Sequence, residues 1–230
     1  MPQVLSENEW LIAIDKPAGL IVHSDGRTEE PSLAEWIAEN YPAHRGIGGD
    51  WVSPQGEHVP LNGLVHRLDR STSGVVIAAK TQEAYDYLKK EFKERHVEKK
   101  YLAFVYGTPT ESQGTIIAEI MRSSEKPKRW YARPCDADDP RAAITDWKVV
   151  EKKDEATLLE VTPKTGRTHQ IRVHLSSIGH PIIADHLYAA EREAILGFKR
   201  PALHAKSITL VLPDGKYETY EAPVPEDFTS

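Results

Sequence analysis

Two apolar runs in the first third of the chain predict buried β-strands. Residues 10–17 read WLIAIDKP and residues 75–81 read VVIAAKT, and each run ends at polar or turn-forming residues. Apolar residues alternate along YLAFVYG, residues 101–107, with Tyr101 on one face and Leu102 on the other. Further strands are expected at residues 115–120, 144–152, 156–163, 205–212 and 217–223.

A helical period follows the second of these runs. Residues 81–96, TQEAYDYLKKEFKERH, place Ala84, Leu88 and Phe92 on one face, behind Thr81, which can cap the helix. The expected strands outnumber the helices, and several links between them are short. We therefore expect an α+β fold with a mixed, mainly antiparallel sheet flanked by helices.

The segment from Asn40 to Asn62 follows neither period. It reads NYPAHRGIGGDWVSPQGEHVPLN and is rich in Gly and Pro. A loop of this length inside a compact domain is usually functional or mobile. The sequence therefore predicts a flap or a substrate-contacting loop here, without a regular element, and a surface insertion is the alternative.

Composition places the chain among ordinary globular proteins. Its 230 residues are 40% hydrophobic and 28% charged, which is enough for a substantial core in one domain or in two closely packed halves. The chain has no run of eighteen apolar residues, and its start lacks the pattern of a signal peptide. We therefore expect a cytoplasmic protein without a membrane partner. The single cysteine, Cys135, excludes an intramolecular disulfide and a multi-cysteine zinc site.

Charge is unevenly distributed along the chain. The formal net charge is −6, which taken alone argues against a partner as acidic as nucleic acid. Basic residues nevertheless cluster in residues 89–100, 122–133 and 164–174. A basic face on an acidic body is one interpretation. For residues 89–100, where glutamates are interspersed, a solvated helix face is the other.

One carboxylate stands out in LVHRLDRSTSGVVIAAKT, residues 64–81. Asp69 lies between Arg67 and Arg70, directly before Ser, Thr and Gly. An Asp in this setting is ordinarily a turn residue, because its side chain hydrogen-bonds nearby backbone amides. The segment alone therefore favours a turn.

A second informative segment, TPKTGRTHQIRVHLSSIGHPI, covers residues 162–182. It predicts a short helix in which Thr168 stands at the N-cap, an apolar stripe begins at Ile171, and Gly179 ends the helix. The loop before it offers Arg167 and helix N-terminal amides, a suitable place for a phosphate.

Arg172 projects along the edge of this predicted buried face. A buried charge without a partner is costly, so the arginine needs an anion. The histidines around it lack the i, i+4 spacing of a helical zinc pair, and we expect no metal site. These histidines are His169, His174, His180, His186 and His204.

HRLDRSTSG together with GRTHQIRVHLSSIGHPI resembles the pseudouridine synthases of the RluA type. The similarity extends through LIAIDKPAGLIVH, VEKKYLAFVYG, LHAKSITL and APVPEDF, over nearly the whole chain. Related synthases of the small-subunit type have Gly-Arg-Leu-Asp and a different arginine motif, so His66, Gln170 and Ile171 favour the RluA type.

The resemblance implies a pseudouridine synthase fold with a central RNA-binding cleft. It implies a single catalytic domain over residues 1–230, without the separate N-terminal RNA-binding domain that many relatives carry. One departure is ADHLYA, residues 184–189, where the family often has Gly-Asp-x-x-Tyr-Gly. Asp185 and Tyr188 stay in place, but alanine replaces both glycines.

The implied activity is the isomerisation of uridine to pseudouridine in large-subunit ribosomal RNA, transfer RNA or both. The bond from sugar to base nitrogen breaks, the base rotates, and it rejoins through carbon five without a redox change, so no cofactor is expected. The resemblance makes Asp69 the catalytic carboxylate. Attack on the base, attack on the sugar and removal of a sugar proton all stay open. Each needs an ionised, nearly dry carboxylate.

The resemblance also assigns a partner to Asp69. Burial raises an Asp pKa above its reference of about 3.9, and a nearby guanidinium lowers it. Pairing with Arg172 would keep Asp69 charged and would satisfy the arginine, so we expect Arg172→Ala to lose most activity with the fold intact. Tyr101 is implied to stack on the target base and to accept the final proton, with a core aromatic as the alternative.

The remaining implied roles concern RNA binding. Arg67 would touch the RNA and help displace the target base, with a surface salt bridge as the alternative. His66, Thr72, Ser73 and Gly74 would shape the turn. The expected partner is an RNA stem-loop, and the expected state is a monomer. The implied RNA-binding residues are Arg67, Arg70, Lys100, Arg167 and His169.

Two other functions compete with isomerisation. One is a non-catalytic RNA-binding or assembly factor on the same fold, which would gain nothing from an acid facing phosphate. The other is a glycoside or nucleoside hydrolase, which would need a second catalytic carboxylate. Asp185 is the candidate for that carboxylate.

Overall fold

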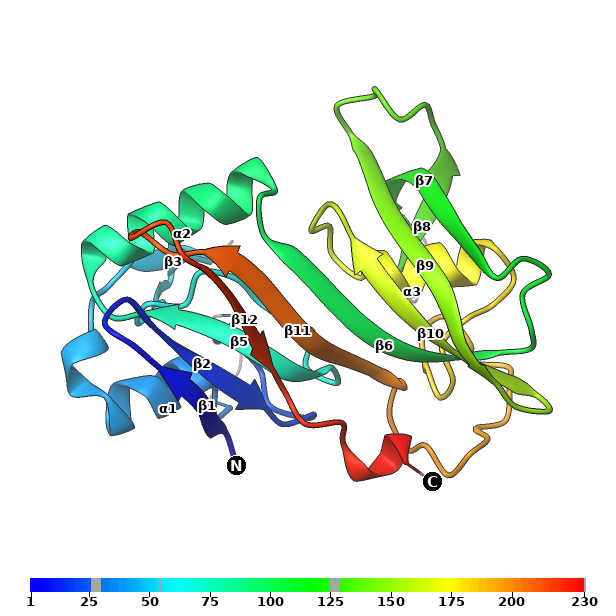
Figure 1. Ribbon diagram of the computed structural model, residues 1–230, viewed down its shortest axis with the longest axis horizontal. Helices are drawn as coiled ribbons and strands as arrows, with labels where there is room; N and C mark the ends of the chain where they lie inside the picture. Colours follow the sequence, from blue (N-terminus) through cyan, green and yellow to red (C-terminus); the bar gives the residue numbers. More distant parts are fainter. Residues whose placement is uncertain (26–29, 54, 125–128, 230) are drawn as a thin grey trace. The chain divides into compact units, whose positions relative to one another are not determined.

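The computed structural model describes residues 1–25, 30–53, 55–124 and 129–229, and the chain divides into two compact units (Figure 1). Unit 1 comprises Met1–Glu98 and Ala205–Pro223, and unit 2 comprises Lys99–His204 and Val224–Ser230. Each unit encloses its own hydrophobic core. No helix in the described part of the chain is long and apolar enough to cross a membrane.

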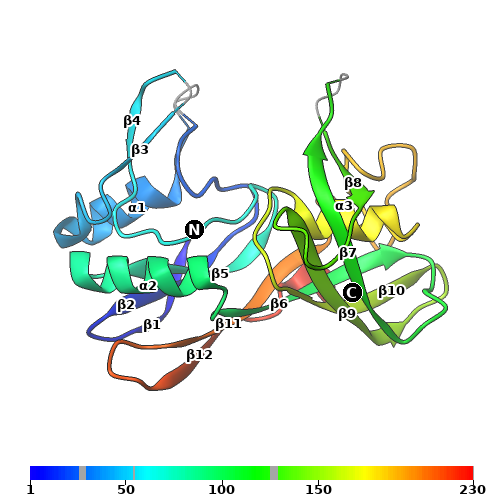
Figure 2. The same ribbon diagram turned by 90° about the horizontal axis from the view of Figure 1, so that it is seen from above.

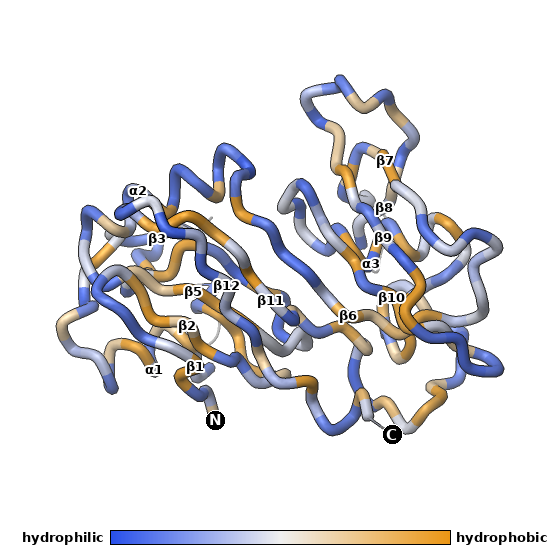
Figure 3. The backbone as a smooth tube through the Cα atoms, in the orientation of Figure 1, coloured by the Kyte–Doolittle hydropathy of each residue, from blue (hydrophilic) through white to orange (hydrophobic). Residues whose placement is uncertain are grey.

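The strands of unit 1 form a sheet built around one fully buried strand. The pairs β1–β2, β2–β5 and β11–β12 are antiparallel. Every residue of β5 is buried, as expected for a continuous apolar run, and Figure 3 shows the hydrophobic colouring of β2 and β5. In spatial order the strands are β1 (Gln3–Glu7), β2 (Leu11–Lys16), β5 (Ser73–Ala79), β11 (Leu203–Val211) and β12 (Tyr217–Glu221).

Helix α2 (Gln82–Glu94) confirms the helix predicted behind Thr81. The Thr81 hydroxyl accepts a hydrogen bond from the Ala84 amide at 3.1 Å. Ala84 and Leu88 are fully buried and pack in the core of unit 1. The apolar face of the helix therefore covers the sheet, and its charged face is solvated.

Helix α1 (Leu33–Asn40) has no counterpart among the predicted elements. Its N-terminus is a capping box, in which the Glu35 amide donates to the Ser32 hydroxyl and the Glu35 carboxylate accepts from the Ser32 amide. Ser-x-x-Glu before an apolar run is the sequence signal for such a start. Figure 2 shows α1 and α2 over the same face of the sheet of unit 1.

The expectation that residues 40–62 hold no regular element is wrong. The segment contains a 3-10 turn, η1 (Pro42–His44), and a hairpin of β3 (Asp50–Val52) and β4 (His58–Pro60). The Ser53 hydroxyl accepts from the Glu57 amide at 3.1 Å at the hairpin turn. Strands of three residues are too short to show a period of two, which is why the pattern does not reveal them.

The strands of unit 2 also pair antiparallel, with a helix packed on them. Helix α3 (Gln170–Ser177) packs on β7, β8, β9 and β10. Together with unit 1 this confirms the predicted α+β class. The strand order is β6 (Glu98–Tyr106), β10 (Ala156–Pro163), β9 (Ala142–Lys152), β7 (Gln113–Arg122) and β8 (Trp130–Pro134).

The C-terminal segment closes the core of unit 2. The short 3-10 helix η2 (Glu226–Phe228) places the ring of Phe228 against Phe104 and Phe198, with centroids 5.7 and 5.2 Å away. Arg200 donates from Nε and Nη2 to the two carboxylate oxygens of Asp227 at 2.8 and 2.9 Å. This bidentate pair fastens the segment to the sheet.

Candidate functional site

The carboxylate at position 69 lies in the turn that the sequence predicts. The Thr72 amide donates to the Asp69 carbonyl at 3.1 Å, and Asp69 is half-buried. Arg67 and Arg70 are exposed on either side, and Arg70 forms an ion pair with Glu30. The turn precedes β5 directly.

Lys16 binds the main chain of this turn through its buried ammonium group. Its side chain is fully buried, and Nζ donates to the carbonyls of Pro17, Leu20 and Arg70 at 2.9, 2.8 and 3.2 Å. The Gly19 amide donates to the same Arg70 carbonyl at 2.8 Å. A buried ammonium needs such acceptors, so the lysine fixes the backbone one residue after Asp69. The sequence does not reveal the contact between Lys16 and Arg70, because the two residues are 54 positions apart in the chain.

Gly74, the second residue of β5, has a conformation that only glycine adopts easily. Its φ is +114°, and a Cβ built on it would lie 2.1 Å from the Ala205 carbonyl oxygen of β11. Both the backbone angle and the close approach of Ala205 therefore require glycine at this position.

We expect Gly74→Ala to lower the free energy of unfolding by about 3 kcal/mol or more, because backbone strain and a backbone clash add. Gly215→Ala is the matched control, since Gly215 also has a positive φ, +85°, but has nothing within 4 Å of its Cβ position. Urea denaturation of both variants measures the difference. Equal losses would show that the contact with Ala205 does not matter.

His66 ties the same loop to its neighbours. Its Nε2 accepts from the Ile77 amide at 3.0 Å, and its ring stacks on Phe92 with centroids 4.7 Å apart. Because Nε2 is an acceptor, this nitrogen carries no proton. His66 therefore shapes the turn, as the sequence predicts.

The segment before α3 is organised by the side chain of Gln170. Its Oε1 accepts from the Thr165 hydroxyl and the Arg167 amide at 2.7 and 2.9 Å. Its Nε2 donates to the Ile144 carbonyl and the Thr145 hydroxyl at 3.0 and 2.9 Å. This buried network fixes the loop to β9.

The predicted N-cap of α3 is one residue out of place. His169, with φ of 54°, occupies the N-cap and caps with no side-chain hydrogen bond, whereas Thr168 lies before it and is exposed. The Gln170 side chain accepts from the Arg167 amide in the loop before the helix, three residues earlier in the chain. Arg167 is exposed, as expected of a phosphate contact.

His174 belongs to the core of unit 2. It is fully buried, and burial lowers its pKa to about 4, so the ring is neutral at physiological pH. Its Nδ1 lies 2.9 Å from the Thr145 hydroxyl, which also bonds Gln170. The interpretation of this histidine as a hydrogen-bonded core residue is confirmed.

Arg172 is buried and forms a bidentate ion pair with Asp185. Its Nε and Nη2 donate to the two carboxylate oxygens at 2.7 and 2.9 Å, and only 5% of the arginine side chain and none of the aspartate side chain is exposed. The amides of Leu187 and Tyr188 donate to the same carboxylate at 3.0 and 3.2 Å. The buried arginine thus has an anionic partner within unit 2 that sequence analysis did not foresee.

The carboxylate of Asp185 is held ionised by these donors. Burial raises its pKa, but the hydrogen bonds and charge of Arg172, with the amides of Leu187 and Tyr188, outweigh burial and hold the pKa below its usual value. The pair uses the Nε–Nη2 edge of the guanidinium. Pairing of Arg172 with Asp69, which belongs to unit 1, stays a prediction.

Tyr101 and Lys100 lie near the start of β6 in unit 2. Tyr101 is half-buried, stands opposite Val161 of β10, and packs against the core. From residue 102 to residue 106 every side chain of β6 is buried. The alternation in the sequence therefore marks two buried faces of a central strand, with Tyr101 at the boundary of the buried part.

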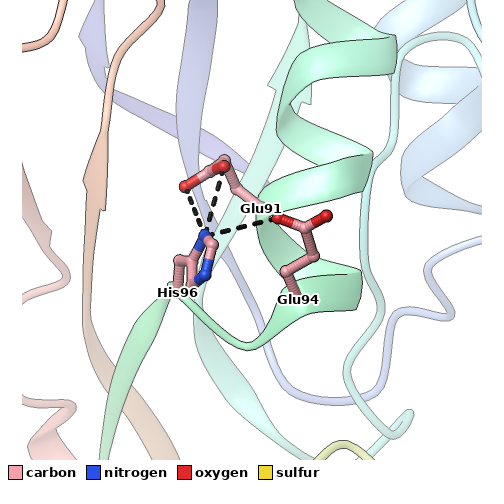
Figure 4. A group of neighbouring side chains, drawn as sticks. All are labelled: Glu91, Glu94 and His96. Atoms are coloured by element: carbon pink, nitrogen blue, oxygen red, sulfur yellow. Dashed lines mark hydrogen bonds and ion pairs between the residues drawn. The ribbon is translucent and has the colours of Figure 1, made fainter.

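Among the described residues, one group of side chains could hold a metal ion. Glu91, Glu94 and His96 offer ligand atoms within 4.8 Å of one another at the end of α2 (Figure 4). His96 Nδ1 lies 3.3 Å from Glu91 and 3.7 Å from Glu94, and more than half of the imidazole is exposed. When protonated, this histidine is itself the cation of the group, which is an ordinary surface ion-pair cluster.

Comparison with known proteins identifies a family and several relatives of this chain. The model of the RNA pseudouridylate synthase family matches residues 10–177. Ribosomal large subunit pseudouridine synthase D of Zymomonas mobilis is 34% identical over 98% of this chain and 70% of its own length. The synthase of the same name from Nitrosomonas europaea is 36% identical over 99% of this chain and 63% of its own length. The chain spans about two thirds of the length of the curated relatives it matches.

Solved structures show the same fold. Human RNA pseudouridylate synthase domain containing 1 superposes with a TM-score of 0.74 at 26% identity, covering 98% of this chain and 84% of that one. Human RNA pseudouridylate synthase domain containing 4 gives a TM-score of 0.72 at 23% identity over 98% of this chain and 90% of that one. The family match includes Asp69, Tyr101 and Arg172. The chain therefore belongs to the RNA pseudouridylate synthase family.

Proposed function

We propose that this protein isomerises specific uridines of large-subunit ribosomal RNA to pseudouridine, with Asp69 as the catalytic carboxylate. The observation that carries the proposal is the family match over residues 10–177, which contains both the Asp69 turn and the buried Arg172. Relatives named ribosomal large subunit pseudouridine synthase support this RNA as the substrate. Transfer RNA is the second substrate class to test.

The residues of the site divide the work as follows. Asp69 drives cleavage of the bond between sugar and base. Arg172, oriented by Asp185, pairs with Asp69 and keeps it ionised as water is excluded. Tyr101 stacks on the extruded base.

The phosphate contacts are exposed or half-exposed cations, Arg67, Lys100 and Arg167. Loss of one such contact is expected to reduce the slope of log affinity against log salt by about 0.7 for a single-stranded segment. Arg167→Gln should show this change in filter-binding titrations at several salt concentrations. Lys216→Gln is the control, since this exposed lysine already pairs with Asp214 at 2.7 Å. If both variants give the same slope, Arg167 does not contact an RNA phosphate.

Tyr101→Phe is expected to separate stacking from proton transfer. The phenyl ring still stacks, so RNA affinity should stay within about twofold, whereas loss of a proton acceptor should slow release of the proton from carbon five by about a hundredfold. Single-turnover release of tritium from carbon-five-labelled uridine measures this step. Tyr101→Leu, which also removes the ring, should weaken binding as well. An unchanged rate in Tyr101→Phe would leave stacking as its only role.

The two competing functions are disfavoured for different reasons. A pure RNA-binding factor gains nothing from an acid in the turn between two exposed arginines. A hydrolase needs a second carboxylate that can activate water, and the side chain of Asp185 is fully buried and bonded to Arg172 and two amides. Asp185 is therefore not a candidate for that role.

One assay distinguishes the three functions. In vitro transcribed bacterial large-subunit ribosomal RNA and transfer RNA, each labelled with tritium at carbon five of uridine, are incubated with the protein in EDTA and without any cofactor. Tritium release without free uracil supports isomerisation. Free uracil would indicate hydrolysis, and bound but unmodified RNA would leave a binding protein.

A further inference from the structure

Tyr188 is the point at which three separate segments of unit 2 meet. Its ring lies 5.1 Å from the guanidinium carbon of Arg172. Its hydroxyl lies 2.9 Å from Nδ1 of His169, and it accepts a hydrogen bond from the Trp130 amide at 3.2 Å. The loop after α3, the N-cap of α3 and strand β8 thus share one half-buried side chain.

Both hydrogen bonds of this side chain use the same phenolic oxygen. The Trp130 amide can only donate, so the oxygen accepts that bond. The second bond joins the oxygen to Nδ1 of His169. Both bonds are lost together when the hydroxyl is removed.

Trp130 is the first residue of β8, and we use the name β7–β8 hairpin for the described residues 113–122 and 129–134. Arg122, Arg129 and Arg133 of this hairpin are exposed, within one of the basic clusters of the sequence, of which residues 125–128 lie outside the described part of the chain. Arg122 stands opposite Trp130 in the strand register. A main-chain donor moves with its strand, so a displacement of β8 would act on the hydroxyl of Tyr188.

The main chain and the ring of Tyr188 contact the buried ion pair of Arg172 and Asp185. Its amide donates to Asp185 at 3.2 Å, and its ring covers the guanidinium that Asp185 holds. A cation over an aromatic face is attracted to it, more strongly when water is excluded. A shift of this ring therefore changes the orientation of Arg172.

We propose that Tyr188 is a positioning residue that couples RNA on the β7–β8 hairpin to the orientation of Arg172. The proposal rests on the proposed isomerase function. The hairpin binds RNA phosphates, the Trp130 amide fixes the Tyr188 hydroxyl, and the ring holds the guanidinium toward the reacting carboxylate. In this proposal Tyr188 acts through Arg172.

Tyr188→Phe tests the coupling because it keeps the ring and removes both hydrogen bonds. At saturating protein, the single-turnover rate of tritium release is expected to fall by about tenfold to a hundredfold, as for a reactive group that loses its orientation. The dissociation constant for the same ribosomal RNA should stay within about twofold. Tyr131→Phe is the matched control, since this exposed tyrosine of the same hairpin directs its hydroxyl at the Met121 sulfur, 3.6 Å away, within the hairpin itself.

A double-variant cycle separates coupling from simple damage. Replacing Arg122 and Arg129 by Gln should lower the saturated rate in the wild-type background, and should lower it no further in the Tyr188→Phe background. Amide hydrogen exchange at Trp130 should be faster in Tyr188→Phe whether or not RNA is present. A merely structural tyrosine would change thermal stability without changing the rate at saturation.

The outcomes distinguish this proposal from the function on which it rests. A wild-type protein that forms no pseudouridine overturns the function. An active wild type with Tyr188→Phe as fast as Tyr131→Phe, or with independent effects in the cycle, overturns the role of Tyr188 alone.

Discussion

Asp69→Asn is expected to lower the rate of pseudouridine formation by about a thousandfold or more, the range found when an essential reacting group is removed. The amide has the shape of the carboxylate but no negative charge, so it cannot displace the base, attack the sugar or remove a sugar proton. Asp69 is half-buried, and the turn is closed by its main-chain carbonyl, which the substitution keeps. Folding and RNA affinity should therefore change little.

Single-turnover tritium release measures the rate, and filter binding with the same ribosomal RNA measures the affinity. Asp86→Asn on the exposed face of α2 is the matched control, since its carboxylate accepts from the Gln82 side chain, one helical turn away, at 2.9 Å. Asp69→Ala guards against slow reversion of asparagine to aspartate. If both Asp69 variants react at a rate within tenfold of wild type, Asp69 is not the catalytic carboxylate.

The elements that the sequence predicts well are those with long, clear patterns. The apolar run of β5 and the capped period of α2 are both confirmed, because burial on one or both faces dictates the pattern. Short elements with a mixed pattern, such as α1 and the β3–β4 hairpin, escape prediction. For α1 the capping box of Ser32 and Glu35 is a readable signal.

The sequence shows which segments carry the candidate site, but it does not show which residues of those segments contact one another. The motifs around Asp69 and Arg172 are visible in the sequence, but the partner of Arg172 within unit 2 is Asp185, and the support beneath the Asp69 turn is Lys16. The lysine and the turn are far apart in the chain, and local propensity says nothing about such contacts. The N-cap of α3 is His169 and not the predicted Thr168, and it has a left-handed backbone and no side-chain hydrogen bond, so the usual capping signal in the sequence does not mark it.

The ion pair between Arg172 and Asp185 changes what Arg172→Ala should do. The variant is expected to be inactive, because the carboxylate of Asp69 loses its proposed partner. It should also lose about 3 to 5 kcal/mol of unfolding free energy, because a fully buried carboxylate is left behind. Its loss of activity would therefore be ambiguous. Arg172→Met combined with Asp185→Leu removes both charges and should recover part of the stability but none of the activity, since the amides of Leu187 and Tyr188 lose their acceptor.

Acid denaturation gives an independent check on this pair. The pKa of Asp185 is below its usual value in the folded protein, so its contribution to stability is present above the unfolded pKa of about 3.9 and is lost as pH falls through the folded value. Wild-type stability should therefore fall below about pH 4. The fall should be shallower in the double variant that combines Arg172→Met with Asp185→Leu, because this carboxyl no longer takes up a proton on unfolding. Urea denaturation at pH 3 to 7 compares the two proteins. If the two curves of stability against pH run parallel, Asp185 is not held ionised by Arg172. If the double variant forms pseudouridine at the wild-type rate, Arg172 is not needed to keep Asp69 charged.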